Sequence, residues 1–311
     1  MMNLKKPKFW DYKKPNFLSY LLYPFSLIVE LYNLLNTKNN NDKFKIKTIC
    51  VGNIYVGGTG KTSLCIKINE ILSKKNLKSC FIKKYYKNQE DEQKILANKN
   101  KVFLSSNRLE SIKNAEYNKF DIAILDDGLQ DKSIEYDLSI VCFNNLNWIG
   151  NGMTIPSGPL RESINNLKKY KHIFINGNLE NINNLKNQLL KINPKIEIHI
   201  GKYVIENLDD FNLKENFLVF SGIGNHKTFI SMLQNYNFKV IEELEFPDHY
   251  KYNYEDINKI LSKANDLNCT ILTTEKDYIR LESLISNKIK FIKSDLQIVD
   301  EDKFNNLILN I

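Results

Sequence analysis

The chain has 311 residues, of which 42% are hydrophobic and 26% are charged. This length suits one large domain or two modest domains, and this composition excludes a generically disordered chain. With only 12 glycines and 7 prolines, a fibrous or linker-dominated protein is excluded as well. The net charge of +8 is compatible with an anionic substrate, a membrane surface or nucleic acid, and does not choose among them.

Three rarer residue types, cysteine, arginine and histidine, further limit the class of protein. The five cysteines form no C-x-x-C pair and leave an odd thiol, which is typical of reduced core cysteines in a cytosolic protein. The basic residues are almost all lysine, and only three are arginine: Arg108, Arg161 and Arg280. The four histidines are scattered along the chain, so no metal-ligating cluster of histidines is predicted: they are His172, His199, His226 and His249.

The N-terminal segment, residues 1–43, is basic and then apolar. Residues 17–35 carry apolar side chains at helical spacing, and Pro24 is expected to kink or restart this helix. A narrow polar stripe runs along it: Ser19, Tyr23, Ser26, Glu30 and Asn33. No small-residue cleavage site follows, and the stripe interrupts the apolar run, which argues against a signal peptide and a transmembrane helix. Two interpretations remain: a helix packed on the protein's own core, and an amphipathic helix lying in a membrane interface.

From residue 44 onward, short apolar strands alternate with helices, which is typical of a parallel sheet with helices on both faces. The expected strands are 46–51, 79–82, 101–104, 121–125, 138–143, 172–175, 196–200, 217–220, 240–244, 270–272 and 289–292. The expected helices are 61–73, 108–116, 161–169, 179–191, 227–235, 254–264 and 277–285. Residues 84–100 are predicted to be a long loop passing into a short helix. Because residues 201–214 are polar and strand-poor, we expect an α/β domain over 44–205 and a smaller α/β domain over 206–311.

The strongest local signal is the segment Val51-Gly-Asn-Ile-Tyr-Val-Gly-Gly-Thr-Gly-Lys-Thr62. It follows a predicted strand and opens a predicted helix, as a phosphate-binding loop does. Its glycines let backbone N–H groups converge on phosphate oxygens, while Lys61 reaches the β- and γ-phosphates and Thr62 binds Mg²⁺. Tyr55 stands where the general G-x-x-x-x-G-K-[ST] pattern has its first glycine. We predict a nucleotide site made of Gly57, Gly58, Thr59, Gly60, Lys61, Thr62 and Ser63.

A second half of the same site is predicted at the end of the strand 121–125. The strand delivers two carboxylates, Asp126 and Asp127, at the edge where ligands of parallel sheets bind. Either carboxylate is suited to hold the Mg²⁺ that bridges the phosphates of a bound nucleotide.

Further polar residues lie where the strand pattern breaks. Asp91 and Glu92 are expected in the polar loop after the second strand. Arg161 stands in a Pro-Ser-Gly-Pro-Leu-Arg-Glu turn, and its planar guanidinium can grip a phosphate or carboxylate in a way that lysine cannot. His249 follows Asp248 at a strand end of the second domain, where a carboxylate can orient an imidazole and raise its basicity.

Taken together, these segments resemble the tetraacyldisaccharide 4′-kinase (lipid A 4′-kinase) family. That family carries, in this order, motifs that appear here at 51–62, 126–130 (D-D-G-x-Q), 158–162 (G-P-L-R-E), 220–224 (F-x-G-I-G), 246–249 (F-P-D-H) and 274–277 (T-E-K-D). The resemblance spans most of the chain, including the basic and apolar N-terminus. It also accounts for Tyr55, because the loop of this family lacks the first glycine.

The resemblance implies a P-loop NTPase-like fold and a role for each matching residue. Lys61 and Thr62 would hold the triphosphate of ATP, and the Mg²⁺ ligands would be Thr62, Glu92, Asp126 and Asp127. Asp91 and His249 would activate the sugar hydroxyl, with Arg161 in the same cleft. Three departures affect the loop at 84–92 and its surroundings: the family's R-G-Y is Lys84-Tyr-Tyr86, its G-D-E glycine is Glu90, and the histidine after D-D-G-x-Q is Asp131.

The implied reaction moves the γ-phosphoryl group of ATP to the 4′-hydroxyl of an acylated glucosamine disaccharide 1-phosphate. The resemblance further implies a monomer without nucleic acid, acting on an anionic membrane surface at the cytoplasmic face of the inner membrane of a Gram-negative bacterium. One alternative is a P-loop ATPase or GTPase switch without a lipid acceptor, although no N-K-x-D-like guanine-reading segment is present. Another is a nucleic-acid-binding protein, although the sequence offers the positive charge without a recognised binding motif.

Overall fold

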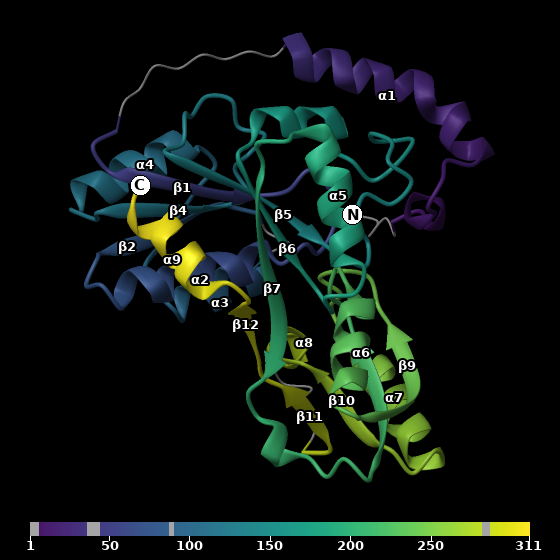
Figure 1. Ribbon diagram of the computed structural model, residues 1–311. Coiled ribbons are helices and arrows are strands. Elements are labelled where there is room, and N and C mark those ends of the chain that lie inside the picture. The colour runs from purple at the N-terminus through teal and green to yellow at the C-terminus, as the bar shows by residue number, and fades with distance from the viewer. Residues whose placement is uncertain (1–5, 36–43, 87–89, 282–286) are drawn as a thin grey trace.

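The computed structural model describes residues 6–35, 44–86, 90–281 and 287–311. It divides into an eight-stranded sheet with helices on both faces and a smaller four-stranded sheet below it (Figure 1). The strand order is β12-β7-β6-β5-β1-β4-β2-β3 in the large sheet and β11-β10-β8-β9 in the small one. All pairs are parallel except β12 with β7. The predicted α/β class, with a second smaller α/β unit and an N-terminal helix, is confirmed.

The strands of the large sheet are β1 (Lys47–Gly52), β2 (Ser79–Lys84), β3 (Val102–Ser105), β4 (Ile122–Asp126), β5 (Leu138–Asn144), β6 (His172–Asn176), β7 (Glu197–Ile205) and β12 (Ser294–Ile298). Those of the small sheet are β8 (Asn216–Ser221), β9 (Lys239–Glu245), β10 (Thr270–Thr274) and β11 (Ile289–Ile292). The α-helices are α1 (Phe17–Leu35), α2 (Lys61–Ser73), α3 (Glu90–Ala97), α4 (Arg108–Tyr117), α5 (Ile182–Ile192), α6 (His226–Asn235), α7 (Tyr254–Asp266), α8 (Glu275–Leu281) and α9 (Glu301–Leu309). Short 3₁₀ helices occupy Lys8–Asp11, Ile164–Lys169 and Leu208–Asp210.

The central strands of the large sheet are buried on both faces. Along β1, β4 and β6 nearly every residue is buried, as expected for parallel strands covered by helices on either side. One core lies between the sheet and α4 and α5, and the other lies between the sheet and α2 and α9. Two layers of apolar side chains therefore hold the sheet rigid, and its strand ends carry the loops that bind ligands.

The C-terminal segment corrects the predicted domain boundary. The expected second domain, 206–311, ends early, because β12 returns to the large sheet and pairs antiparallel with β7 from Ser294↔Ile205 to Ile298↔Gly201. Phe304 and Ile308 of α9 then pack into the core beside α2. Strand β12 was not predicted, because its five residues carry only two buried apolar side chains. The small sheet with its helices is thus inserted between β7 and β12.

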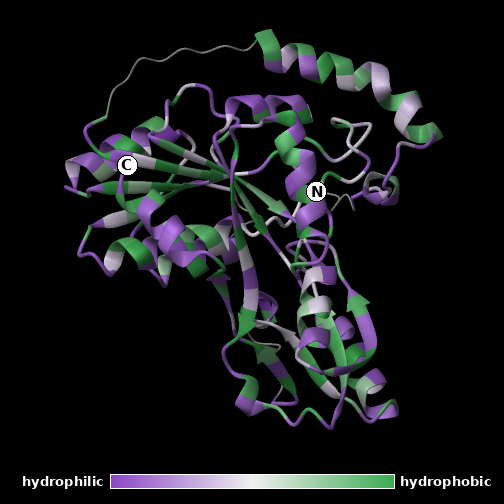
Figure 2. Cartoon of the chain, viewed as in Figure 1, coloured by the Kyte–Doolittle hydropathy of each residue, from purple (hydrophilic) through white to green (hydrophobic). Residues whose placement is uncertain are grey.

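Helix α1 lies at one edge of the large domain (Figure 1). In contrast to a core helix, it turns its polar face toward the protein and its apolar face outward. It is continuous through Pro24, so the predicted restart at this proline is wrong. Its buried residues are Ser19 and Ser26, whereas most of its large apolar side chains, Phe17 and Ile28 among them, are exposed, and Leu22 and Val29 are half-buried. Figure 2 shows hydrophobic residues along the length of α1, at the periphery of the large domain. The interpretation of α1 as a helix packed on the core by its apolar face is therefore wrong.

The polar stripe of α1 is what holds it to the protein. Ser26 donates a hydrogen bond to the carbonyl of Thr154 at 2.8 Å, and Thr154 donates to Glu30 at 2.5 Å. Asn33 donates to the carbonyl of Arg161 at 3.2 Å. Of the predicted stripe, Tyr23 alone is exposed. By length and composition α1 is also long and apolar enough to cross a membrane.

Candidate active site

The phosphate loop connects the end of β1 to the first turn of α2. Gly60 has φ +76° at the N-cap of α2, and Gly57 has φ +135°, so both take backbone conformations that favour glycine. Inside the loop, Asn53 donates to the hydroxyl of Thr59 at 2.9 Å, and Asn176 of β6 donates to the carbonyl of Thr59 at 2.6 Å. The loop is therefore fixed in shape by the sheet beneath it, with the N-terminus of a helix behind it.

Tyr55 fills the position of the missing first glycine and ties the loop to the N-terminal segment. Its ring is fully buried, and its hydroxyl donates to Asp11 at 3.0 Å while accepting from Lys6 at 2.6 Å. Burial, together with the nearby charge of Asp11, raises the pKa of this phenol far above its usual range. The departure from the general loop pattern thus has a structural role, because it anchors the residues that precede α1.

The carboxylates that follow β4 lie beside the phosphate loop. Thr62 donates to Asp126 at 3.0 Å, as the two predicted halves of the site require. Asp127 has φ +67° and accepts from Arg161 at 2.8 Å. Burial alone would raise the pKa of Asp127, but the charges of Lys61 and Arg161 lower it to about 2. Both carboxylates are therefore held at the end of the strand, and Asp127 is ionised at neutral pH.

Residues Asp91 and Glu92 are in the first turn of α3, and the prediction that they lie in a loop is wrong. The predicted loop does pass into this helix, but the helix begins at Glu90, which brings both side chains to the end of β2. Lys83 of β2 is buried and bridges Glu92 at 2.7 Å and Asp126 at 2.6 Å. The positive charge of this lysine therefore stands between the two carboxylates nearest to the phosphate loop.

The small sheet brings the ends of its own strands against this edge. Gly224, in the loop after β8, approaches Gly58 so closely that a Cβ on either residue would lie within 3 Å of the other's backbone. After β9, His249 contacts Asp91, with 3.0 Å between Nδ1 and the nearer carboxylate oxygen. After β10, Lys276 of α8 pairs with Glu92 at 3.0 Å. Predicted residues from both domains thus meet in one place.

The Asp91–His249 pair is strongly polarised. Burial alone would raise the pKa of Asp91, but the hydrogen bond with His249 and the charge of Arg280 hold it well below its usual range. Burial alone would lower the pKa of His249, but the hydrogen bond to Asp91 and the charge of Asp248 outweigh burial and raise it. Asp91 therefore stays ionised and favours an imidazole that carries its proton on Nδ1.

Arg280 supports this pair and was missed by the sequence analysis. Its guanidinium donates to Asp91 at 2.5 Å and to Asp277 at 2.9 Å, and Asp277 is fully buried. Lys83 and Lys276 were also missed as members of the site. A signal for Arg280 was present, because arginine is rare in this chain, and the same rarity drew attention to Arg161.

The residues beside the phosphate loop fit a hard divalent cation. Thr62, Asp126, Asp127 and Glu92 offer oxygen ligands, which Mg²⁺ prefers. The second carboxylate oxygen of Asp126, Oδ1, is buried without a hydrogen-bond partner among the described residues. A buried carboxylate oxygen of this kind is costly unless a donor or cation satisfies it.

A cavity of about 590 Å³ opens beside Asp127 and Arg161. Its wall combines the C-terminal end of α1 with residues that follow β2 and β4. The basic residues that line it are Lys84, Arg108, Lys132 and Arg161. The cavity therefore joins the edge of the phosphate site to the apolar helix at the surface.

A parallel sheet with a glycine-rich loop before a helix, and carboxylates at the neighbouring strand end, defines a P-loop protein. The model of the family described as tetraacyldisaccharide-1-P 4'-kinase matches residues 18–311. A tetraacyldisaccharide 4'-kinase from Pelagibacter ubique is 56% identical over 310 residues, covering 100% of this chain and 99% of the relative. One from Rickettsia felis is 33% identical over 330 residues, covering 99% of this chain and 98% of the relative.

The chain therefore belongs to the tetraacyldisaccharide-1-P 4'-kinase family, and the predicted family and kinase class are confirmed. Among solved structures, the crystal structure of LpxK from Aquifex aeolicus in complex with ATP matches with a TM-score of 0.67. It is 22% identical, and the match covers 94% of this chain and 99% of that chain. This likeness shows that the fold is shared along nearly the whole length.

Proposed function

We propose that this protein transfers the γ-phosphoryl group of ATP to the 4′-hydroxyl of a tetraacyl glucosamine disaccharide 1-phosphate, giving lipid IVA in lipid A synthesis. The observation that carries the proposal is the meeting of the phosphate loop with the Asp91–His249 pair where the two sheets approach each other. The family supports the acceptor, and the LpxK structure containing ATP supports the donor.

The phosphate loop and the carboxylates would hold the donor. Backbone N–H groups of Gly57, Gly58, Thr59, Gly60, Lys61, Thr62 and Ser63 would surround the phosphates at the N-terminus of α2. Lys61 would neutralise the β- and γ-phosphates. A bound Mg²⁺, held by Thr62, Asp126, Asp127 and Glu92, would supply charge neutralisation on the phosphate oxygens.

His249 would accept the proton of the attacking hydroxyl. With Nδ1 donating to Asp91, the other ring nitrogen is left as the acceptor, and the ionised Asp91 stabilises the imidazolium that forms. Arg161 contacts Asp127 and would help to neutralise charge at the transferring group. Because His249 and Lys61 belong to different domains, the relative position of the domains would control this step.

The basic cavity beside Asp127 is our proposed site for the sugar headgroup. Lys84 and Lys132 would contact its anionic phosphate, and the same cavity reaches Tyr32 and Asn33 near the end of α1. Acyl chains leaving the cavity would therefore meet the exposed apolar face of α1, which suits a lipid that stays in the bilayer.

Helix α1 would rest on an anionic membrane surface, with its polar stripe bonded to the protein. Each large apolar side chain that leaves water contributes ~1.5–3 kcal/mol, and each lysine near an anionic surface adds ~1 kcal/mol. Exposed lysines, Lys13 and Lys14, precede the helix. Because ATP is cytoplasmic, we place this contact at the cytoplasmic face of the inner membrane of a Gram-negative bacterium.

The reaction is tested by incubating the protein with ATP, Mg²⁺ and a tetraacyl disaccharide 1-phosphate, followed by mass spectrometry. A product heavier by one phosphate, formed only with both substrates, supports the proposal. ATP turnover that is unchanged by the lipid would instead favour the ATPase alternative.

The membrane contact is tested by sedimentation with anionic liposomes. The double variant Ile28→Asp/Leu31→Asp should lose binding, because both side chains lie on the exposed apolar face. Tyr117→Asp is the matched control, since Tyr117 is an exposed aromatic residue on α4. Equal sedimentation of all three proteins would contradict the role proposed for α1.

A further inference from the structure

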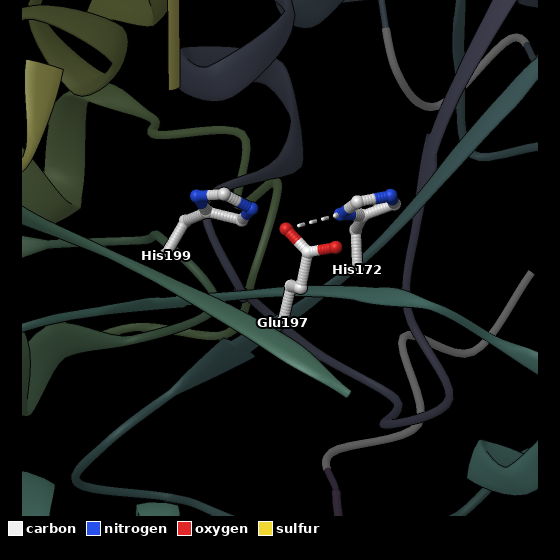
Figure 3. A group of neighbouring side chains, drawn as sticks. All are labelled: His172, Glu197 and His199. Atoms are coloured by element: carbon white, nitrogen blue, oxygen red, sulfur yellow. Dashed lines mark ion pairs between the residues drawn. The ribbon is translucent and has the colours of Figure 1, made fainter. Parts of the chain in front are cut away.

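Two of the four scattered histidines come together on one face of the large sheet. His172 is the first residue of β6, and the strand register sets it opposite Glu197 of β7. His199 lies two residues further along β7 and therefore points to the same face. Figure 3 shows the carboxylate of Glu197 lying between the two imidazole rings. The expectation that the histidines form no cluster is thus wrong, because sheet pairing joins residues that are distant in sequence.

The three side chains are close enough to share one ion. Nδ1 of His172 lies 4.0 Å from a carboxylate oxygen of Glu197, and one ligand atom from each of the three residues lies within 4.8 Å of the others. Around a tetrahedral zinc ion with bonds of about 2.0–2.2 Å, donor atoms are ~3.3 Å apart. Glu197 is half-exposed, so its side chain has room to close the gap between the observed separation of the ligand atoms and the separation expected around zinc.

The imidazole nitrogens are buried without hydrogen-bond partners. Both ring nitrogens of His199 and Nδ1 of His172 lack a partner within the described parts of the chain. The two residues are only 3% and 5% exposed. Leaving a buried polar group unsatisfied costs ~1–3 kcal/mol, and such groups are rare in folded proteins. A metal ion that accepts one lone pair from each ring removes part of that cost.

Packing holds the two rings in place beside α9. Phe304 of α9 packs edge-on against His199, with ring centroids 5.2 Å apart. The centroids of the His172 and His199 rings are 5.8 Å apart.

The charges nearby are mixed. Lys171 and Lys303 oppose a cation, whereas Glu197 and Asp300 attract one. The pair between Lys171 and Glu197 spans 3.4 Å, and the Lys171 side chain is 70% exposed. An exposed ion pair of this kind contributes little, so a divalent ion can replace the lysine at the carboxylate.

We propose that His172, Glu197 and His199 bind one divalent transition-metal ion of the zinc class, which links β6 to β7 beside α9. Two imidazoles and one carboxylate, with a further position left for water, is a donor set that zinc takes in proteins. It differs from the all-oxygen set proposed for Mg²⁺ at the phosphate loop.

This site is separate from the kinase site. His172 is four residue steps from Asn176 along β6, and His199 is four steps from Tyr203 along β7, which is roughly 13 Å at ~3.3 Å per residue. Asn176 and Tyr203 are the residues of these strands that contact the phosphate loop and α2. The ion is therefore expected to stabilise the fold and to leave the turnover rate unchanged.

The test measures Zn²⁺ binding to the purified full-length protein, in buffer containing Mg²⁺, by competition with a chromophoric chelator. The wild type should take up one Zn²⁺ per chain and melt at a higher temperature when zinc is added. Glu197→Gln and His199→Gln should weaken binding by at least about tenfold and abolish the zinc-dependent rise in melting temperature. Glu243→Gln is the matched control, because Glu243 lies 3.6 Å from His226 but belongs to no group of three ligands among the described residues.

If His199→Gln fails to fold, Glu197→Gln still tests the proposal, because substitution of the half-exposed Glu197 is expected to leave the fold intact. As a second readout, Co²⁺ added to the wild type should produce visible d–d absorption bands that Glu197→Gln alters. Equal zinc affinity of the wild type and Glu197→Gln would overturn the proposal. A zinc-dependent rise in melting temperature that is the same in both proteins would overturn it too.

Discussion

The strand ends of the two sheets carry different ionisable side chains. The large sheet delivers the phosphate loop after β1, Asp91 and Glu92 after β2, and Asp126 and Asp127 after β4. The small sheet delivers His249 after β9, and Lys276 and Arg280 after β10. Between the two edges, Asp91 pairs with Arg280 and Glu92 pairs with Lys276, and these ion pairs join the domains.

On the proposed assignment of the site, neither domain alone contains all of the reacting groups. The residues proposed to hold a triphosphate belong to the large sheet, yet its Asp91 has no imidazole to orient without the small sheet. The small sheet carries the imidazole but lacks a phosphate loop. Substitutions at the two edges should therefore fail in different ways, and the following experiments separate them.

Lys61→Ala should have the largest effect, because it removes the positive charge of the phosphate loop. We expect turnover to fall by about 10³-fold or more, with the melting temperature little changed, since Lys61 is not part of the apolar face of α2. Steady-state kinetics and thermal unfolding check both parts. Lys74→Ala, an exposed lysine at the other end of α2, is the control. Near-normal turnover of Lys61→Ala at saturating ATP would refute the assignment of the loop.

Asp91→Ala and His249→Ala should each lower kcat by ~10²–10⁴-fold while ATP binding changes little. Their double variant should lose much less than the product of the two single losses, because the two groups act as one unit across the domain boundary. A double-variant cycle of kcat values measures this coupling. Independent, multiplicative losses would mean that the two side chains do not cooperate.

Arg280→Lys keeps the charge but loses the planar grip on Asp91 and Asp277. We expect kcat to fall about tenfold, equivalent to ~1.4 kcal/mol in the barrier, with the KM for ATP unchanged. Because Arg280 acts through Asp91, the pH profile should shift together with kcat. A loss of thermal stability with unchanged kcat would assign Arg280 a purely structural role.

The pH dependence of the rate should show the smallest effect, but this effect is the most specific to His249. The base must be neutral, so the rate should rise with pH and level off above the pKa of His249, which lies above its ordinary value. Asp91→Asn removes a charge that raises this pKa, so the rising limb should move to lower pH. The measurement is kcat/KM as a function of pH for both proteins. If the rising limb of the pH profile lies at the same pH in Asp91→Asn as in the wild type, His249 is not the group whose protonation controls the rate.

The sequence alone predicted the parallel sheet and the glycine-rich loop before α2, because these depend on local pattern, and it assigned Thr62 and Asp126 to two halves of one site. The bounds of α2 match the prediction of 61–73, since a glycine N-cap and a regular apolar face mark them. Strand β12 escaped notice, because a short edge strand with few apolar residues has no periodic signal.

Other parts depended on contacts between distant segments. Lys83 has no feature in the sequence that separates it from the other lysines, and its acidic partners, Glu92 and Asp126, come from other segments of the large domain. Lys276 and Arg280 meet Glu92 and Asp91 only because the two sheets are apposed. The outward orientation of α1 was equally hidden. Apolar periodicity shows that a helix has two faces, and it does not reveal which face meets the protein.

The inserted position of the small domain has a consequence for how the molecule can be taken apart. The chain enters that domain at the end of β7 and leaves it at the start of β12, and these strands are paired where they cross, at Ile205 and Ser294. Both connections therefore belong to one antiparallel pair of strands, and the small domain is joined to the large domain along this pair. Removal of the C-terminal residues would remove β12 and α9 from the large domain. Excision of 208–292, with a short linker between β7 and β12, would leave the eight-stranded sheet whole.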